Sequence, residues 1–213
     1  MKGLLFIILF YITYLSLLIS GSEFAMWLKP FLVPSLLLLF IESQKKVLDR
    51  TLIGAIGFSA LGDLLLIFDG RSFFILGLLS FLLAHLFYIW IFKKRSNAIT
   101  LNIKNSFLGV IMLVYYVALM SYLWPHLGDM RIPVMVYGLV ISSMLWMAAM
   151  LVTKPWGWLL VMGAVLFVVS DSLLSVRLFV NAFDYDAFWV MLTYLSAQLC
   201  LVYGLFSVED ERS

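Results

Sequence analysis

The sequence predicts an all-α membrane protein, a polytopic helix bundle with eight transmembrane helices. Of its 213 residues, 64% are apolar and only 12% are charged, whereas a soluble domain carries roughly 25% charged residues. The apolar residues fall in runs of roughly 17 or more, long enough for a helix to cross a bilayer. Backbone groups in lipid need partners within their own segment, and the alternation typical of a membrane barrel is absent, so we expect helices.

Eight apolar runs define the expected spans, which together form a single integral membrane domain over residues 1–213. The first run resembles a signal peptide, but it is longer than the usual apolar region and a second span follows almost at once, so we expect it to stay uncleaved. In the second run, Pro30 and Pro34 predict a kink. The expected spans are residues 3–20, 24–41, 51–68, 72–93, 105–124, 132–152, 156–178 and 187–207.

Lysine and arginine are distributed unequally between the two sides of this arrangement. With the amino terminus inside, most of them fall in cytoplasmic segments, which is the orientation that the positive-inside rule favours. Both termini are therefore predicted in the cytoplasm, and the compact loops suit a bacterial inner membrane. The inner residues are Lys2, Lys45, Lys46, Arg50, Lys93, Lys94, Arg95, Lys104, Lys154 and Arg212, and the outer ones are Lys29, Arg71, Arg131 and Arg177.

Two aspartates, Asp63 and Asp171, interrupt the third and seventh apolar runs. An aspartate at the bilayer centre costs about 2.5–3.5 kcal/mol on insertion scales, so each needs a reason to be there. Each follows a small residue and is the acid of the third span in a set of four, an arrangement that suggests two parallel four-helix repeats. Both spans run in the same direction and carry their acid at a similar depth, so we expect the two carboxyl groups to come together.

Other polar residues recur at helical spacing inside the spans and are expected to face the bundle interior, because buried polar groups need partners. Each has a structural alternative as a hydrogen bond between helices. Lys29 is either a snorkelling anchor or a cation for an anionic headgroup. Most other aromatic residues, Tyr115 and Tyr116 among them, are expected at the membrane interface or in the core. The candidate supporting residues are Lys29, Ser59, His85, Tyr88, Ser170, Tyr194 and Gln198.

Two buried carboxyl groups suit acid–base hydrolysis, because burial and mutual repulsion favour one protonated acid beside one carboxylate. With two histidines and one cysteine in the chain, a histidine-rich zinc site is not expected. No nucleophile elbow, phosphate-binding loop or nucleic-acid footprint is present. The sequence also departs from presenilin-like aspartyl proteases, since Ser170 stands where that family has tyrosine before the acid.

Five pieces of the sequence, taken in order, resemble the YhhN family of eight-span membrane proteins, which includes the lysoplasmalogenases. Single pieces are weak signals, but their combination covers nearly the whole chain. They are Lys29-Pro30, Phe58-Ser59-Ala60-Leu61-Gly62-Asp63, Phe81-Leu82-Leu83-Ala84-His85-Leu86-Phe87-Tyr88, Phe167-Val168-Val169-Ser170-Asp171-Ser172-Leu173-Leu174, and Tyr194 with Gln198.

The resemblance implies hydrolysis of the vinyl ether bond of a lysoplasmalogen, a lysophospholipid of the membrane, to a fatty aldehyde and glycerophosphoethanolamine or glycerophosphocholine. It implies no metal and no organic cofactor. One of Asp63 and Asp171 would protonate the vinyl ether and the other would stabilise the cation and activate water, while Lys29 would meet the phosphate. The alternatives are a transporter or lipid-binding protein that uses the acids as a proton relay, and a hydrolase of another ether or ester lipid.

Overall fold

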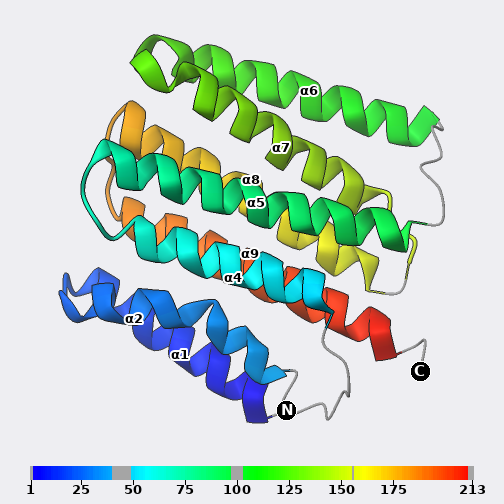
Figure 1. Cartoon of the computed structure of the whole chain (residues 1–213), viewed down its shortest axis with the longest axis horizontal. Coiled ribbons are helices and arrows are strands. Elements are labelled where there is room, and N and C mark those ends of the chain that lie inside the picture. The colour runs from blue at the N-terminus through cyan, green and yellow to red at the C-terminus, as the bar shows by residue number, and fades with distance from the viewer. Residues whose placement is uncertain (1, 40–48, 97–102, 155, 211–213) are drawn as a thin grey trace. The chain divides into compact units, whose positions relative to one another are not determined.

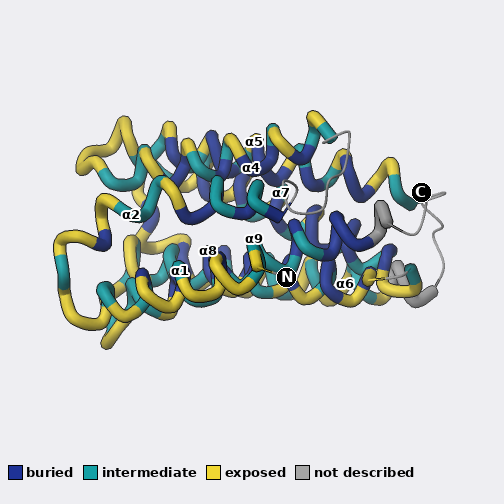
Figure 2. The backbone as a smooth tube through the Cα atoms, turned by 90° about the horizontal axis from the view of Figure 1, so that it is seen from below, coloured by how far each residue is buried: buried dark blue, intermediate teal, exposed yellow. Residues whose placement is uncertain are grey.

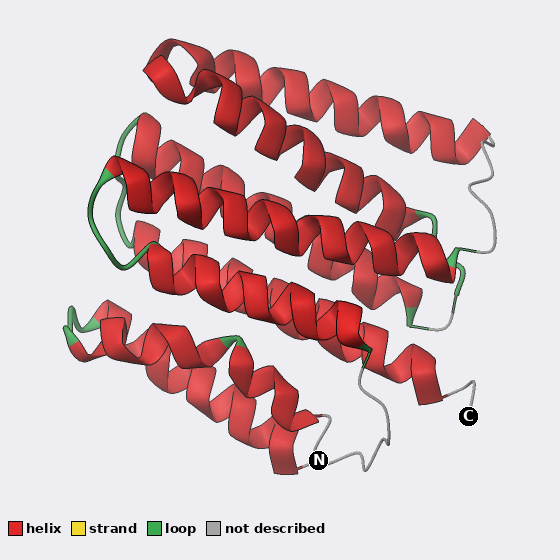
Figure 3. Cartoon of the chain, viewed as in Figure 1, coloured by secondary structure: helices red, strands yellow, loops and turns green. Residues whose placement is uncertain are grey.

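The computed structural model describes residues 2–39, 49–96, 103–154 and 156–210, and the side chains of all of these except 103–106 and 208–210. Over the described residues the chain forms helices and turns and contains no strand (Figures 1 and 3). The predicted all-α class is confirmed. The chain divides into two compact units, Met1–Phe87 and Tyr88–Ser213, and each is described by itself.

The first unit begins with two connected helices, of 18 and 9 residues, and a 3-10 turn. The hydroxyl of Tyr11 donates a hydrogen bond to the carbonyl of Leu32 at 3.2 Å, which ties the first helix to the end of the second. The second helix, which contains Pro30, ends at Leu32, and a 3-10 turn begins at Pro34, which has no N–H to donate to a continuing helix. The described elements of the unit are α1 (Lys2–Ile19), α2 (Phe24–Leu32), η1 (Pro34–Leu37), α4 (Arg50–Leu65) and the first part of α5 (Arg71–Arg95).

Helix α4 carries Asp63 and packs closely against α5. Its start is capped by Asp49, whose carboxylate accepts a hydrogen bond from the backbone N–H of Thr51 at 2.8 Å. Near its end, a Cβ atom on Gly62 would lie 2.6 Å from the ring of Phe81 on α5. Only glycine permits this approach, and small residues serve the same purpose wherever membrane helices pack closely.

The second unit contains the remaining helices, arranged as successive neighbours: α6 packs on α7, α7 on α8, and α8 on α9 (Figure 1). Among the candidate membrane spans, α9 is the most buried and α6 the least. Figure 2 shows the backbone coloured by burial. The described elements are the end of α5, α6 (Ile103–Leu123), η2 (Trp124–His126), η3 (Gly128–Met130), α7 (Arg131–Ala149), α8 (Gly157–Phe179) and α9 (Asp186–Asp210).

Helices α8 and α9 are held together along their length by small residues and polar links. A Cβ atom on Gly163 would lie 3.0 Å from the carbonyl oxygen of Ala197, so the two backbones approach closely. At the connecting end, Arg177 and Asp186 form an ion pair at 3.2 Å. This close pairing fixes the rotation of α8, and with it the direction in which Asp171 points.

Six of the described helices are long and apolar enough to cross a membrane, and the chain is an integral membrane protein. They correspond to the first and the fourth to eighth expected spans. The second is a shorter apolar segment, Phe24–Leu37, and the third is α4, which has 16 residues. Residues 40–41 of the second expected span, together with Lys45, Lys46 and Arg212, lie outside the described residues.

Candidate functional site

The two aspartates singled out by the sequence lie in different units, Asp63 in the first and Asp171 in the second. Each is therefore described in its own surroundings, and their pairing stays a prediction. Asp171 belongs to the better defined of the two environments, because a cavity lies directly beside it.

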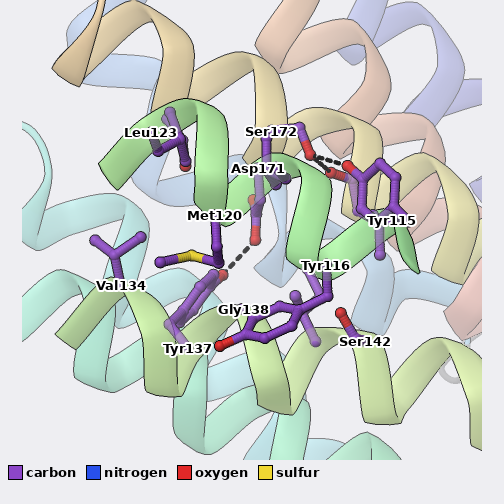
Figure 4. A pocket seen from close by; sticks show the side chains of 14 residues that line it. Tyr115, Tyr116, Met120, Leu123, Val134, Tyr137, Gly138, Ser142, Asp171 and Ser172 are labelled. Carbon is purple, nitrogen blue, oxygen red and sulfur yellow. Dashed lines mark hydrogen bonds between the residues drawn. The ribbon is translucent and has the colours of Figure 1, made fainter. Parts of the chain in front are cut away.

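Asp171 projects from α8 toward α7, where its carboxylate accepts a hydrogen bond from the hydroxyl of Tyr137 (Figure 4). The tyrosine is buried, while the aspartate is only partly buried. Hydrogen bonds to a carboxylate are stronger than those between neutral groups, and they fix its orientation. Tyr137 therefore holds one carboxylate oxygen of Asp171 in place.

The next residue on α8, Ser172, is held by two neighbours. Its hydroxyl lies within hydrogen-bond distance of the Tyr115 hydroxyl on α6, and it also donates to the carbonyl of Val168 at 2.6 Å (Figure 4). Two tyrosines from two helices thus secure two consecutive residues of α8. The site is built where α6, α7 and α8 all contact one another.

A cavity of about 30 Å³ lies among these three helices. This volume suffices for roughly one or two water molecules. Its apolar end is formed by Met120, Leu123 and Val134, which belong to a buried cluster at that end of α6 and α7. Its polar lining consists of Tyr115, Tyr116, Tyr137, Ser142, Asp171, Ser172 and Ser175.

In the first unit, Asp63 is 2% exposed and Ser59, one helical turn earlier on α4, is fully buried. His85 is also fully buried, on α5, one turn after the Phe81 ring that Gly62 accommodates. Lys29 stands in the last turn of α2, the helix that contacts both α1 and α4. The acid of this unit is therefore more deeply enclosed than Asp171.

The other candidates from the sequence lie on α5, α8 and α9. The hydroxyl of Tyr88 donates to the side-chain carbonyl of Gln198 at 2.8 Å, which joins the fourth and eighth expected spans. The Ser170 hydroxyl donates to the carbonyl of Val190 at 3.0 Å, and so secures α8 to α9 one residue before the acid. The ring of Tyr194 meets Phe167 edge-on, with centroids 5.4 Å apart.

Sequence reasoning missed Tyr137 and assigned Tyr115 to the core or the interface. The available signal was chemical: a tyrosine hydroxyl buried in a bundle needs a partner, and acceptors on side chains are scarce here. What periodicity could not supply is the rotation of α7 and α6 about α8, which depends on packing between helices.

No group of three or more histidine, cysteine, aspartate or glutamate side chains that could hold a metal ion occurs among the described residues. The polar groups at Asp171 are a carboxylate and hydroxyls. Such a set can orient a water molecule, accept its proton and stabilise a nearby positive charge.

Comparison with known proteins gives a consistent result. The model of the YhhN family matches residues 24–205. The chain is 36% identical over 148 residues to lysoplasmalogenase TMEM86B of Rattus norvegicus, covering 70% of this chain and 58% of that protein. It is 33% identical over 160 residues to a lysoplasmalogenase of Mycobacterium tuberculosis, covering 74% and 60%. It is 31% identical over 170 residues to lysoplasmalogenase TMEM86A of Bos taurus, covering 76% and 67%.

The chain thus spans about three fifths of the length of the first two of these relatives. No solved structure matches the chain.

Proposed function

The chain belongs to the YhhN family, and we propose that it is a lysoplasmalogenase, a hydrolase that cleaves the vinyl ether bond of lysoplasmalogens within the membrane. The products are a fatty aldehyde and glycerophosphoethanolamine or glycerophosphocholine. The proposal is supported by relatives of that name at 31–36% identity over 70–76% of the chain. One structural observation carries its chemistry: a carboxylate oriented by a tyrosine beside a cavity of water size.

The reaction consumes one water molecule and needs a proton at a carbon atom. A proton is added to the vinyl carbon farther from oxygen, and the double bond becomes an oxocarbenium ion. Water adds to the carbon next to oxygen, and the resulting hemiacetal loses the glycerol oxygen as a hydroxyl group, leaving the aldehyde. The rate therefore depends on an acid, on stabilisation of a cation and on a positioned water.

We assign the second and third of these roles to Asp171. Its carboxylate accepts the Tyr137 hydrogen bond, so a negative charge there is supported and its direction is set. The adjoining cavity has room for the attacking water. A carboxylate so placed stabilises the oxocarbenium ion and then takes a proton from the water that adds to it.

We assign the acid to Asp63. It is 2% exposed in a helix that packs closely on its neighbour, and an ionised carboxyl group is costly in the interior of a membrane. A neutral carboxyl group there can give its proton to the vinyl carbon. Ser59, one turn earlier on the same buried face, would orient it, and His85 would help to order the surrounding polar groups.

The remaining candidates are proposed as supporting residues. Lys29 would pair with the phosphate of the headgroup, since an ammonium is a suitable counter-ion for it. Tyr88 and Gln198, joined at 2.8 Å, would hold α5 on α9, and Ser170 would fix α8 on the same helix. Tyr194 would support α8 through its contact with Phe167.

We also propose that the chain forms one membrane domain with eight spans, in which α4 and the Phe24–Leu37 segment complete the six longer candidates. Both termini would be cytoplasmic, in a bacterial inner membrane. The basic cluster Lys93, Lys94 and Arg95 in the last turn of α5 supports this orientation. The two sets of four spans would be parallel repeats.

The decisive assay uses purified protein and synthetic single-chain lipids. Aldehyde release is expected from a 1-alkenyl lysophospholipid, with and without a metal chelator, and not from the matched 1-alkyl or 1-acyl lysophospholipid. Release of a fatty acid from the 1-acyl lipid, with no aldehyde from the 1-alkenyl lipid, would identify a different lipid hydrolase. No release from any of them, together with proton-coupled uptake in vesicles, would overturn the proposal in favour of a transporter.

A further inference from the structure

An apolar groove of about 310 Å³ lies between α6 and α7, next to the much smaller cavity at Asp171. Its volume is at the lower end of the ~300–1,000 Å³ range that ligand pockets occupy. Met112 and Leu113 of α6 line one side, and Leu139 and Trp146 of α7 line the other. A single hydrocarbon chain is the kind of ligand that this size and lining fit.

Two of the three hydroxyl groups that border the groove, those of Ser143 and Tyr116, are used within the protein. Ser143 donates to the carbonyl of Leu139 at 2.8 Å, one turn earlier on α7. Tyr116 donates to the carbonyl of Met135 at 3.1 Å. With these groups bonded to backbone, the groove offers carbon atoms to a ligand, so it suits an alkyl or alkenyl chain better than a sugar or an ion.

The groove adjoins the Asp171 cavity, because Tyr116 and Ser142, both labelled in Figure 4, line both spaces. The ring of Tyr116 lies against Gly138, where a Cβ atom would come within 3.1 Å of it. Any side chain at position 138 would push this ring. Gly138 therefore sets the position of the aromatic residue that stands between the two spaces.

The outer side of the groove is open to lipid. On α6, Val110, Leu113 and Val114 are 56%, 57% and 62% exposed. Such side chains on a membrane-spanning helix lie among the hydrocarbon tails. A lipid chain can thus move sideways from the bilayer into the groove without crossing water.

We infer that the groove between α6 and α7 holds the hydrocarbon chain of a single-chain lysophospholipid and leads its reactive end past Tyr116 and Ser142 to Asp171. The inference rests on the proposed function, because the vinyl ether bond lies at the end of the chain nearest the headgroup. A chain seated in the groove would bring that bond to the cavity, and the groove would set the preferred chain length.

A pair of neighbouring substitutions on α6 tests the inference by chain-length preference. Leu113→Trp fills part of the groove, whereas Val114→Trp places the same side chain on an equally exposed position that does not line it. For Leu113→Trp, the ratio of kcat/KM for an 18-carbon over a 12-carbon 1-alkenyl lysophospholipid should fall about tenfold, the discrimination that one misfit methylene produces in an apolar pocket. Val114→Trp should keep the wild-type ratio, and equal ratios for the two variants would overturn the inference.

A binding readout separates this inference from the proposed function. The probe is a 1-alkyl lysophosphatidylethanolamine with a photoactivatable diazirine near the end of its chain, which has no vinyl ether to hydrolyse. Peptide mapping should place the label in residues 109–116 and 139–146, and Leu113→Trp should reduce it while Val114→Trp does not. Labelling in these two segments of a protein that releases no aldehyde would support the groove and overturn the proposed hydrolase function. Aldehyde release with labels confined to other helices would support the hydrolase function and overturn the groove.

Discussion

The hydroxyl of Tyr137 on α7 donates a hydrogen bond to the carboxylate of Asp171 on α8. Its ring is buried, and both residues line the cavity among α6, α7 and α8. An acid that has an oriented donor on one oxygen presents the other oxygen in a defined direction. The hydrogen bond from Tyr137 therefore fixes the position of the Asp171 carboxylate, a group that is costly to place inside a membrane.

Replacing Tyr137 by phenylalanine should lower the kcat for aldehyde release about 10- to 100-fold, because a hydrogen bond to a charged group contributes roughly 1.5–3 kcal/mol. The ring is retained, so packing should change little. Tyr122→Phe is the matched control, since Tyr122 is 54% exposed on α6. Wild-type turnover by Tyr137→Phe would show that Asp171 needs no positioning from α7.

Ser172→Ala should have a smaller effect, with a loss of about 2- to 10-fold in kcat. The serine hydroxyl links Tyr115 to α8 and also donates to the carbonyl of Val168, and a hydrogen bond between neutral groups contributes about 0.5–1.5 kcal/mol. Ser121→Ala, at an exposed position on α6, serves as control. A loss as large as that of Tyr137→Phe would mean that Ser172 itself takes part in the reaction.

Gly62→Ala should disturb the first unit, because its methyl group would lie 2.6 Å from the ring of Phe81. We expect a lower melting temperature and reduced aldehyde release, since Asp63 is the next residue. Gly57→Ala on the same helix meets no atom within 4 Å and should be neutral or slightly stabilising, because alanine favours a helix over glycine by about 1 kcal/mol. Equal melting temperatures for the two variants would contradict the close contact of α4 and α5.

The aldehyde should contain deuterium at the carbon that is protonated when the reaction is run in D₂O. When the reaction is run in D₂O and the aldehyde is reduced at once to the alcohol, one deuterium should be found on carbon 2, the former vinyl carbon farther from oxygen. The oxocarbenium mechanism requires this label, because the acid exchanges with solvent before it gives its proton. A product without deuterium at carbon 2 would exclude protonation at carbon as the first step.

Helix positions followed from the sequence, because each apolar run is bounded by turn residues or charges. The ends were less regular: α4 ends at Leu65, and a turn with Gly70 at φ +121° precedes α5. The second run was expected to kink, and it changes from α-helix to 3-10 turn at Pro34. Local rules sufficed here because proline and glycine act through their own backbone geometry.

Contacts between helices could be predicted only in part from the sequence. Tyr88 and Gln198 were expected from helical spacing to face the bundle interior, and the structure joins them by a hydrogen bond. The partner of Asp171 did not follow, because Tyr137 is distant in sequence and its approach depends on the rotation of α7. The groove between α6 and α7 could not be predicted from the sequence either, since it arises from the mutual packing of the two helices.

The measurement that tests the central claim most directly compares four purified variants for aldehyde release from a 1-alkenyl lysophospholipid. Asp63→Asn and Asp171→Asn replace the proposed acids, and Asp69→Asn and Asp184→Asn replace exposed aspartates. With all four folded and inserted in membranes, we predict that the first two lose hydrolysis, by about 100-fold or more, while the other two retain it. Near wild-type turnover by either Asp63→Asn or Asp171→Asn would contradict the assignment of these two residues as the catalytic carboxyl groups.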